Sequence, residues 1–366
     1  MAVEREHVGI EPFFAGGAWF AASVNLDFQQ IFHFTAVAQT AVITLLAYTC
    51  FSKISFSPKT YRILILSIAF GTGAFCGLNA RLINLGDIEN LRGLRFIFGN
   101  IGTHLQDAID RIPFTDCDIK GLLKALLSGN RSDIPPEITG AFRKAGASHI
   151  LALSGLHLGI IYALISKATS LLGGTRAARM ARCTLNLSIC SVYALATGAS
   201  ASIIRALTFI IINESGRLIH RPTSLDRVLR KSLIVNLIID PESIMDIGFQ
   251  LSYAAMAGIA WIHPFLKEAW SENDSKSLMR KIWNTASISI SCQITTAPLA
   301  YLYFGTFPVY FLLTNLMALP LTGVIIPAAA ITLALNTIGI CPQIFIDITE
   351  KTTTWLIFIL ETIAQM

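Results

Sequence analysis

Long apolar runs separated by short polar or basic stretches are the dominant pattern of this chain. A bilayer is crossed by about 20 consecutive apolar residues. The runs that approach this length are 33–51, 61–79, 150–172, 184–200 and 202–215, and further apolar segments fill 232–265 and 282–366. Gly71, Gly73 and Gly77 give the second run a face suited to close helix packing. We therefore expect an all-α, polytopic membrane protein with about nine or ten transmembrane helices, some of them broken.

One region of the chain is polar rather than apolar. It includes "LRFIFGNIGTHLQDAIDRI", which has helical periodicity, and "PEITGAFRKAG", which predicts a short amphipathic helix ending at Gly146. The predicted organisation is an N-terminal extramembrane segment, two membrane spans, a short extramembrane helical region and a polytopic membrane domain, at 1–32, 33–80, 81–147 and 148–366.

Composition and charge support a membrane protein. Of the 366 residues, 53% are apolar and only 14% are charged, whereas ordinary soluble domains carry about 25% charged residues. The net charge of +5 is concentrated in basic loops at 52–62, 173–182 and 216–231. Positive loops stay on the cytoplasmic side, so this charge is explained without a nucleic-acid partner.

The stretch "SHILALSGLHLGIIYALI" is apolar enough to cross a membrane, yet it carries His149, Ser154 and His157. Ser154 and His157 are three residues apart and therefore share a helix face. His149 lies two turns away on roughly the same side. Gly155 and Gly159 form a GxxxG pair that lets another helix approach closely. We expect this polar face to contact protein or water rather than lipid.

Several interpretations of that stretch remain open. A metal site is disfavoured, because the two imidazoles would lie about 12 Å apart along the helix axis and no HExxH motif is present. A serine hydrolase would use Ser154 and His157, but no element for an oxyanion hole is visible. The remaining interpretations are interhelical packing and a hydrophilic path. We expect no metal, no cofactor and no catalytic residue, and hence no enzyme.

Other polar side chains also lie inside apolar segments. Arg205, in "ASASIIRALTFIII", costs about 2.5–3.5 kcal/mol to insert and needs a partner or water. Asp246 and Gln250 lie in "MDIGFQLSY". Before them, "DPE" interrupts the apolar run, and Asp240 can cap the next helix with Pro241 at its first position.

Four sequence blocks together resemble the ComEC competence family, in order and spacing, over about residues 30–330. The blocks are "ALLSGNRSDI" at 125–134, "FRKAGASHILALSGLHLGII" at 142–161, "ASASIIRALTFIII" at 199–212 and "DPESIMDIGFQLSYAAMAGI" at 240–259. The resemblance implies a multi-pass protein of the bacterial inner membrane that passes single-stranded DNA into the cell during transformation. The matching positions are His149, Ser154, Gly155, His157, Arg205, Asp246, Phe249, Gln250 and Ser252.

The roles of these positions are our hypothesis. The helix that carries Ser154 would line the channel, and Gly155 would allow a second helix or the strand to approach. Arg205 would face phosphates, and Phe249 and Tyr253 would offer faces for base stacking. Single-stranded DNA and membrane lipid are the expected partners, and a homo-oligomer is left open.

The sequence also departs from the family pattern. Typical members carry an oligonucleotide-binding domain, but 81–147 has no run of alternating strands. Many members carry a metallo-β-lactamase-like nuclease domain with HxHxDH, and neither that motif nor a P-loop occurs in this sequence. We therefore expect a separate nuclease and a separate ATPase or other driving partner. The alternatives are a secondary transporter or channel for small anions that uses Arg205, and an intramembrane serine hydrolase.

Overall fold

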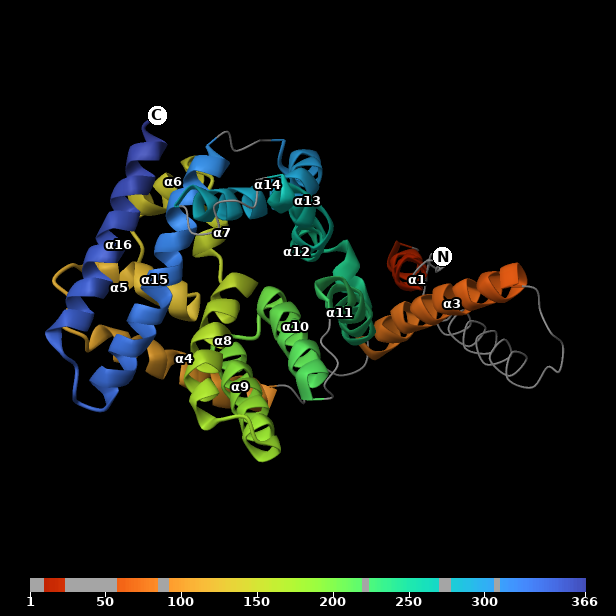
Figure 1. Cartoon of the computed structure of the whole chain (residues 1–366), viewed down its shortest axis with the longest axis horizontal. Helices are drawn as coiled ribbons and strands as arrows, with labels where there is room; N and C mark the ends of the chain where they lie inside the picture. Colours follow the sequence, from red (N-terminus) through yellow and green to blue (C-terminus); the bar gives the residue numbers. More distant parts are fainter. Residues whose placement is uncertain (1–9, 24–57, 85–91, 219–223, 270–277, 306–309) are drawn as a thin grey trace. The chain divides into compact units, whose positions relative to one another are not determined.

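The structure is a computed structural model that describes residues 10–23, 58–84, 92–218, 224–269, 278–305 and 310–366. Every regular element within these ranges is helical, and none of them contains a strand (Figure 1). The all-α prediction is therefore confirmed for this part of the chain. The predicted span at 33–51 lies outside the described residues.

The chain divides into two compact units, and each is described by itself below. The first unit comprises Met1–Leu91 and Arg227–Tyr253, and the second comprises Arg92–Asp226 and Ala254–Met366. The four predicted segments do not follow this division, because the division reports which helices contact one another, whereas the predicted segments rest on hydropathy. The segment boundaries remain a prediction.

In the first unit, glycines bring α1 (Glu11–Ser23) and α3 (Pro58–Asn84) into close contact. A Cβ atom added at Gly17 would overlap the carbonyl oxygen of Phe70, and one added at Gly73 would overlap that of Phe14. One added at Gly77 would lie 2.6 Å from the Cβ of Ala21. Only residues without a Cβ allow backbones to approach this far. The predicted close-packing face is therefore present at Gly73 and Gly77.

The rest of the first unit surrounds the predicted break at "DPE". Helix α11 (Leu225–Ile239), most of which lies in this unit, ends before a 3-10 turn at Pro241–Met245, and α12 (Ile247–Ala257) follows. Pro241 opens the turn as predicted, but the Asp240 side chain makes no capping hydrogen bond to it. The prediction that Asp240 caps the next helix is therefore wrong, because the chain turns again before α12 begins.

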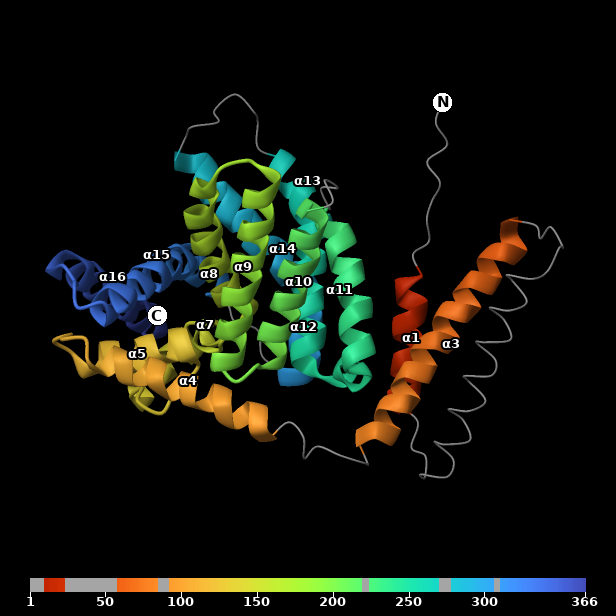
Figure 2. The ribbon, with the colours of Figure 1, turned by 90° about the horizontal axis from the view of Figure 1, so that it is seen from below.

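In the second unit, α8 (Gly155–Thr169), α9 (Arg176–Ala196) and α10 (Ala201–Leu218) lie side by side (Figure 2). We call these three helices the α8–α10 bundle. Its buried core consists of Leu158, Cys190, Ala194, Ile203 and Ile210. The predicted runs at 184–200 and 202–215 fall on the last two of these helices, so two adjacent helices were correctly predicted there.

A larger core in the same unit joins the polar region to the last two helices. It includes side chains from α4 (Arg92–Asp110), α5 (Cys117–Ser128), α6 (Pro136–Lys144), α15 (Phe311–Thr337) and α16 (Gln343–Ala364). The stretch "PEITGAFRKAG" forms α6, as predicted, and the chain turns after it at Gly146, whose φ is 76°. The unit also contains a π-helical turn at Gly258–Ile262, α13 (His263–Glu268) and α14 (Leu278–Phe304).

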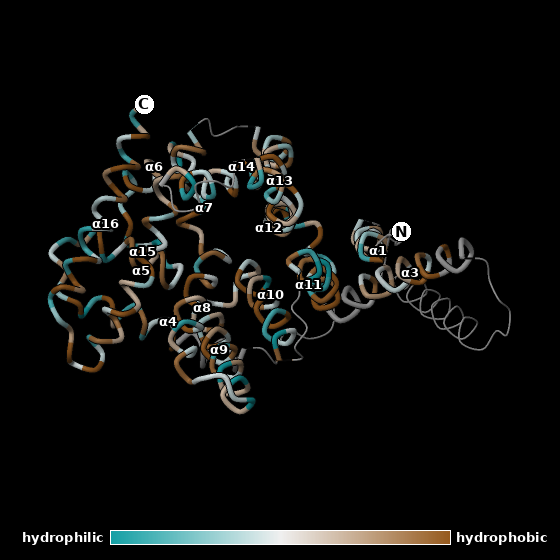
Figure 3. The backbone as a smooth tube through the Cα atoms, in the orientation of Figure 1, coloured by the Kyte–Doolittle hydropathy of each residue, from teal (hydrophilic) through white to brown (hydrophobic). Residues whose placement is uncertain are grey.

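Two of the described helical segments are long and apolar enough to cross a membrane. They are Gly155–Leu172, which is α8 with the turn after it, and Phe311–Thr337, which is α15. Hydrophobic positions run along both helices in Figure 3. A shorter apolar stretch, Ile65–Leu78, lies in α3. The predicted count of nine or ten spans is not confirmed.

Candidate functional site

The stretch "SHILALSGLHLGIIYALI" is two helices rather than one. The short helix α7 (Ser148–Leu151) is followed by extended backbone at Ala152, and α8 begins at Gly155 with Ser154 as its N-cap. His149 and His157 are therefore on different helices, and the prediction of one continuous polar face is wrong. The physical reason is the preference of serine for the N-cap, where its backbone is extended rather than helical.

Ser154 and His157 form a local hydrogen-bonded pair at the start of α8. The backbone N–H of Ser154 donates to Nδ1 of His157 at 3.1 Å, and the Ser154 Oγ lies 3.0 Å from the same nitrogen. This is the arrangement of a capping box, with histidine in the place that Glu or Gln usually takes. The pair thus stabilises the start of an apolar helix.

The same geometry does not resemble a catalytic pair. A catalytic histidine is usually oriented by a third group, whereas Nε2 of His157 makes no hydrogen bond to the residues that the structure describes. The side chain of His157 is also fully buried, at 0% exposure. The geometry therefore favours a capping role over the hydrolase alternative.

Gly155 is the place where α8 approaches α10. A Cβ at Gly155 would lie 3.1 Å from the Cβ of Ala206, which is tighter than ordinary contact. A Cβ at Gly159 would meet nothing within 4 Å among the described residues, so only the first glycine of the predicted GxxxG pair packs against a helix. Arg205, the neighbour of Ala206, is 5% exposed. Four of the predicted site residues therefore share the α8–α10 bundle: Ser154, Gly155, His157 and Arg205.

The other predicted site residues lie elsewhere. His149 is exposed on α7, and its ring centroid lies 6.2 Å from that of Phe311 on α15. Asp246, Phe249 and Gln250 belong to the first unit. Their role in a DNA path stays a prediction.

The three residues in the first unit have local structural contacts. Oδ2 of Asp246 accepts the backbone N–H of Phe249 at 3.1 Å, which is an N-cap contact at the start of α12. Nε2 of Gln250 donates to the carbonyl oxygen of Ile244 at 2.9 Å. Phe249 is buried in the core of this unit. The motifs around Ser154 and Asp246 thus share one structural feature, a helix start that is capped by a side chain.

The sequence reasoning missed a polar network in the bundle that is centred on a buried acid. The hydroxyl of Tyr162 donates to the carboxylate of Glu214, and Nη1 of Arg217 lies 3.0 Å from the Tyr162 oxygen and 3.1 Å from Oε1 of Glu214. Glu214 is buried. An acid in the apolar run 202–215 was visible in the sequence and is a known mark of function in membrane helices. Its partner Tyr162 is 52 residues away, which no local pattern reveals.

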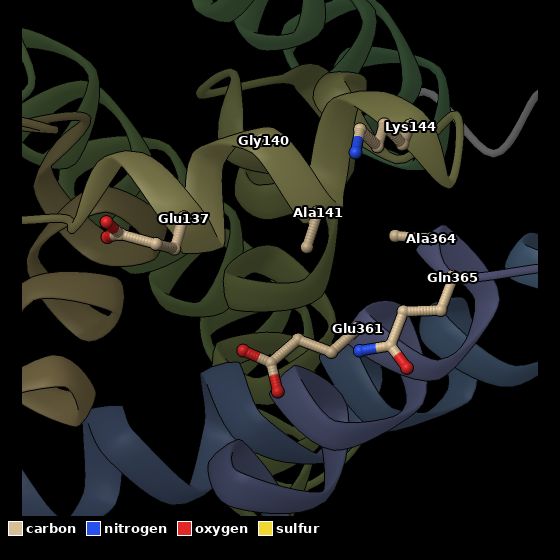
Figure 4. Close-up of a pocket in the computed structure, with 7 residues that line it drawn as sticks. All are labelled: Glu137, Gly140, Ala141, Lys144, Glu361, Ala364 and Gln365. Carbon is tan, nitrogen blue, oxygen red and sulfur yellow. The ribbon is translucent and has the colours of Figure 1, made fainter.

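Two cavities are formed by described residues of the second unit. One, of about 240 Å³, lies at the end of the α8–α10 bundle beside Glu214 and Arg217. The other, of about 350 Å³, lies between α6 and α16 (Figure 4) and is lined by Glu137, Gly140, Ala141, Lys144, Glu361, Ala364 and Gln365. Neither is lined by a predicted site residue, although the first includes two arginines of the basic segment 173–182 and the second includes residues of the predicted amphipathic helix. A search of the described residues finds no cluster of His, Cys, Asp or Glu that could hold a metal ion.

In the part of the chain that the structure describes, all regular elements are helical, and an apolar helix bundle encloses a buried arginine and a capped helix start. The family model described as "Competence protein" matches residues 126–366, and the chain belongs to this family. The resemblance inferred from the four sequence blocks is thereby confirmed.

Two curated relatives are similar to more than half of the chain. "ComE operon protein 3" of Bacillus subtilis (strain 168) is 26% identical over 251 residues, which are 68% of this chain and 31% of that protein. "Competence protein ComA" of Neisseria gonorrhoeae is 25% identical over 209 residues, which are 55% of this chain and 28% of that protein. The chain thus spans about a third of the length of these relatives. No solved structure matches it.

Proposed function

We propose that this chain is a multi-pass protein of the bacterial inner membrane that takes part in DNA uptake during competence, and that its helices line the passage of single-stranded DNA. The observation that carries the proposal is the family match, because residues 126–366 contain every predicted site position. The name of the Neisseria gonorrhoeae relative, "Competence protein ComA", points to the same process. The proposal assigns no catalytic step to the chain, so strand degradation and energy supply belong to a separate nuclease and a separate ATPase or other driving partner.

The exposure of the apolar helices supports a membrane environment. Only 11% of Gly155–Leu172 is buried within the protein, whereas the core helix of a water-soluble protein buries most of its apolar residues. Large apolar side chains of α15 are exposed as well, among them Leu312, Leu313 and Met317. Lipid would cover these surfaces.

The α8–α10 bundle suggests how a strand would be guided. A single strand is a polyanion, and a path for it needs cationic groups for its phosphates. Arg205 lies in the bundle next to Ala206, which Gly155 contacts across the α8–α10 approach. Because Arg205 is buried in this arrangement, a separation of α8 from α10 would be needed to expose it. In the proposal, this separation accompanies DNA passage.

A gene deletion in the native host tests the function. DNA bound at the cell surface and DNA that reaches the cytoplasm would be scored separately, using a selectable marker. Loss of cytoplasmic entry with intact surface binding, restored by the wild-type gene, supports the conduit. Unchanged transformation in a competent host would contradict it.

A second candidate is a transporter or channel for small anions. It is favoured by the burial of a single arginine, Arg205, because one guanidinium suits one small anion as well as one phosphate of a strand. Uptake of labelled phosphate into liposomes that contain the purified protein, together with unchanged transformation in the deletion strain, would favour this candidate over the first.

A further inference from the structure

A basic cavity lies at one end of the α8–α10 bundle. Its volume is about 240 Å³, and it is lined by residues from all three helices and from the turn after α8: Ser166, Ser170, Arg179, Arg182, Asn186, Glu214, Arg217 and Leu218. Three guanidinium groups face one carboxylate, so the cavity carries a net positive charge. Neither the DNA path proposed above nor the family match assigns a role to it.

The single carboxylate of the cavity is already neutralised. Glu214 accepts hydrogen bonds from Tyr162 and Arg217, and the other residues that line the cavity include no second acid to pair with Arg182. Nη1 of Arg179 donates to the carbonyl oxygen of Gly174 at 3.0 Å.

Neutral polar groups complete the lining. Asn186 is buried, and its Oδ1 accepts a hydrogen bond from Thr169 at 3.1 Å, which leaves the Nδ2 group of the same amide as a donor. The hydroxyls of Ser166 and Ser170 lie on the same wall. Guanidinium groups combined with amide and hydroxyl donors suit the oxygens of a phosphate group.

The cavity lies at one end of a candidate membrane span. The segment Gly155–Leu172, which is long and apolar enough to span, ends at this cavity. Apolar side chains around it are exposed, with Leu171 at 88% and Met180 at 59%. Arg179 and Arg182 lie in the first turns of α9, so most of the basic segment 173–182, predicted as a cytoplasmic loop, is helical. Basic pockets at the cytoplasmic ends of membrane helices bind anionic lipid headgroups.

We propose that this cavity binds the phosphate headgroup of an anionic phospholipid of the cytoplasmic leaflet, with Arg182 as the main contact. The volume is below the range of about 300–1,000 Å³ that is typical for drug-sized ligands, so it has room for one headgroup rather than for a series of nucleotides. The exposed apolar rim would contact the acyl chains. The inference rests on the membrane placement in the proposed function but not on DNA passage.

Lipid binding by the purified full-length protein tests this inference. The protein would be placed in nanodiscs of phosphatidylcholine alone or of phosphatidylcholine mixed with cardiolipin. Retained cardiolipin would be counted by native mass spectrometry, and the thermal unfolding midpoint would be measured. The wild type is expected to retain cardiolipin and to unfold at a higher temperature when cardiolipin is present. Arg182→Gln is expected to weaken apparent cardiolipin affinity about tenfold, because it removes charge-assisted hydrogen bonds.

The matched control is Arg176→Gln. Arg176 is exposed on the same basic segment and does not line the cavity, so this variant changes the net charge equally but is expected to keep wild-type cardiolipin binding. Equal losses in the two variants would show attraction by surface charge alone and would overturn the proposal. Arg182→Lys keeps the charge but removes the planar guanidinium group, so it is expected to bind cardiolipin with intermediate affinity. This variant provides a second measurement if Arg182→Gln folds poorly.

Two soluble probes separate the lipid from other sources of phosphate. If inorganic phosphate stabilises the wild type as much as cardiolipin does, the cavity is a site for free anions and the lipid proposal is wrong. If a short single-stranded oligonucleotide displaces cardiolipin and loses binding in Arg182→Gln, the cavity belongs to the DNA path instead. Because no readout here depends on transformation, failure of this inference is distinguishable from failure of the proposed function.

Discussion

The backbone N–H of Ser154 donates a hydrogen bond of 3.1 Å to Nδ1 of His157, three residues further along the chain. This contact explains why an otherwise apolar stretch carries a hydroxyl and an imidazole. The first turn of a helix has backbone N–H groups without helical partners, and leaving such groups unpaired in apolar surroundings is costly. The serine and the histidine allow α8 to begin within the protein rather than at a water-exposed loop.

His157 can therefore be replaced only by a side chain that keeps the acceptor. We expect His157→Ala to lower the free energy of unfolding by at least about 1 kcal/mol, the usual effect of losing an N-cap contact, with a further loss from the cavity that it opens in a fully buried position. His157→Gln retains an acceptor at the capping-box position and should lose less. Thermal unfolding of the full-length protein in nanodiscs measures both. Equal destabilisation by the two variants would contradict the capping role.

The two glycines of α8 should respond in opposite ways to alanine. Gly155→Ala places a methyl group 3.1 Å from the Cβ of Ala206, so α8 and α10 must separate slightly, and we expect a loss of about 1–3 kcal/mol. Gly159→Ala meets no atom within 4 Å among the described residues and should be neutral or stabilising by up to about 1 kcal/mol, because alanine favours helix. Unfolding midpoints of the two variants test this. A larger loss at Gly159 than at Gly155 would show that the helices do not meet as described.

The helices themselves were largely predictable. The apolar runs at 184–200 and 202–215 became α9 and α10. A long apolar segment that is followed by a turn of small residues has few ways other than a helix to pair its backbone N–H and C=O groups. The break before Gly155 was not predicted, because hydropathy is continuous across it. The serine with an acceptor three residues later marked the break, but the same spacing also fits a polar helix face.

The candidate site was predictable only in part. The polar positions in apolar runs were identified correctly, and Ser154, Gly155, His157 and Arg205 share one bundle. Which of them serve the fold and which would serve a ligand depends on contacts between helices that are distant in sequence. The Gly155–Ala206 approach, the Tyr162–Glu214 hydrogen bond and the basic cavity beside it are of this kind.

The predicted extramembrane region should make stability depend on pH through one buried amine. Nζ of Lys124 lies 2.7 Å from carboxylate oxygens of both Asp110 and Asp133. The hydrogen bond from Lys124, aided by one from Ser132, lowers the pKa of Asp133. Burial alone would lower the pKa of Lys124, but its bonds to the two carboxylates raise it overall.

The signs of these pKa shifts set the direction of the effect. The contribution of Asp133 is present above the unfolded pKa of about 3.9 and is lost as the pH falls through the lower folded pKa. That of Lys124 is present below about pH 10.4 and is lost as the pH rises through its raised pKa. Asp133→Asn should be less stable than the wild type at neutral pH, and the difference should shrink in acid. Unfolding midpoints across the pH range measure this, and a difference independent of pH would rule out the ion pair as its source.

Arg205 gives the sharpest test of the DNA path. If Arg205 meets phosphates when α8 and α10 separate, Arg205→Ala should reduce cytoplasmic entry of DNA about tenfold or more, because contacts to a charged group contribute about 1.5–3 kcal/mol. Binding of DNA at the cell surface should be unchanged.

Arg205→Lys keeps the charge and should retain part of the uptake, whereas a purely structural role in a tightly packed site would not be rescued in this way. Arg176→Gln, which removes an exposed arginine outside the bundle core, serves as the control for net charge. Membrane levels of each variant must match the wild type, so that a loss of uptake reports transport rather than folding. Normal transformation by Arg205→Ala at wild-type membrane levels would show that this arginine does not contact the strand, and the conduit would then have to be sought along other polar side chains of the chain.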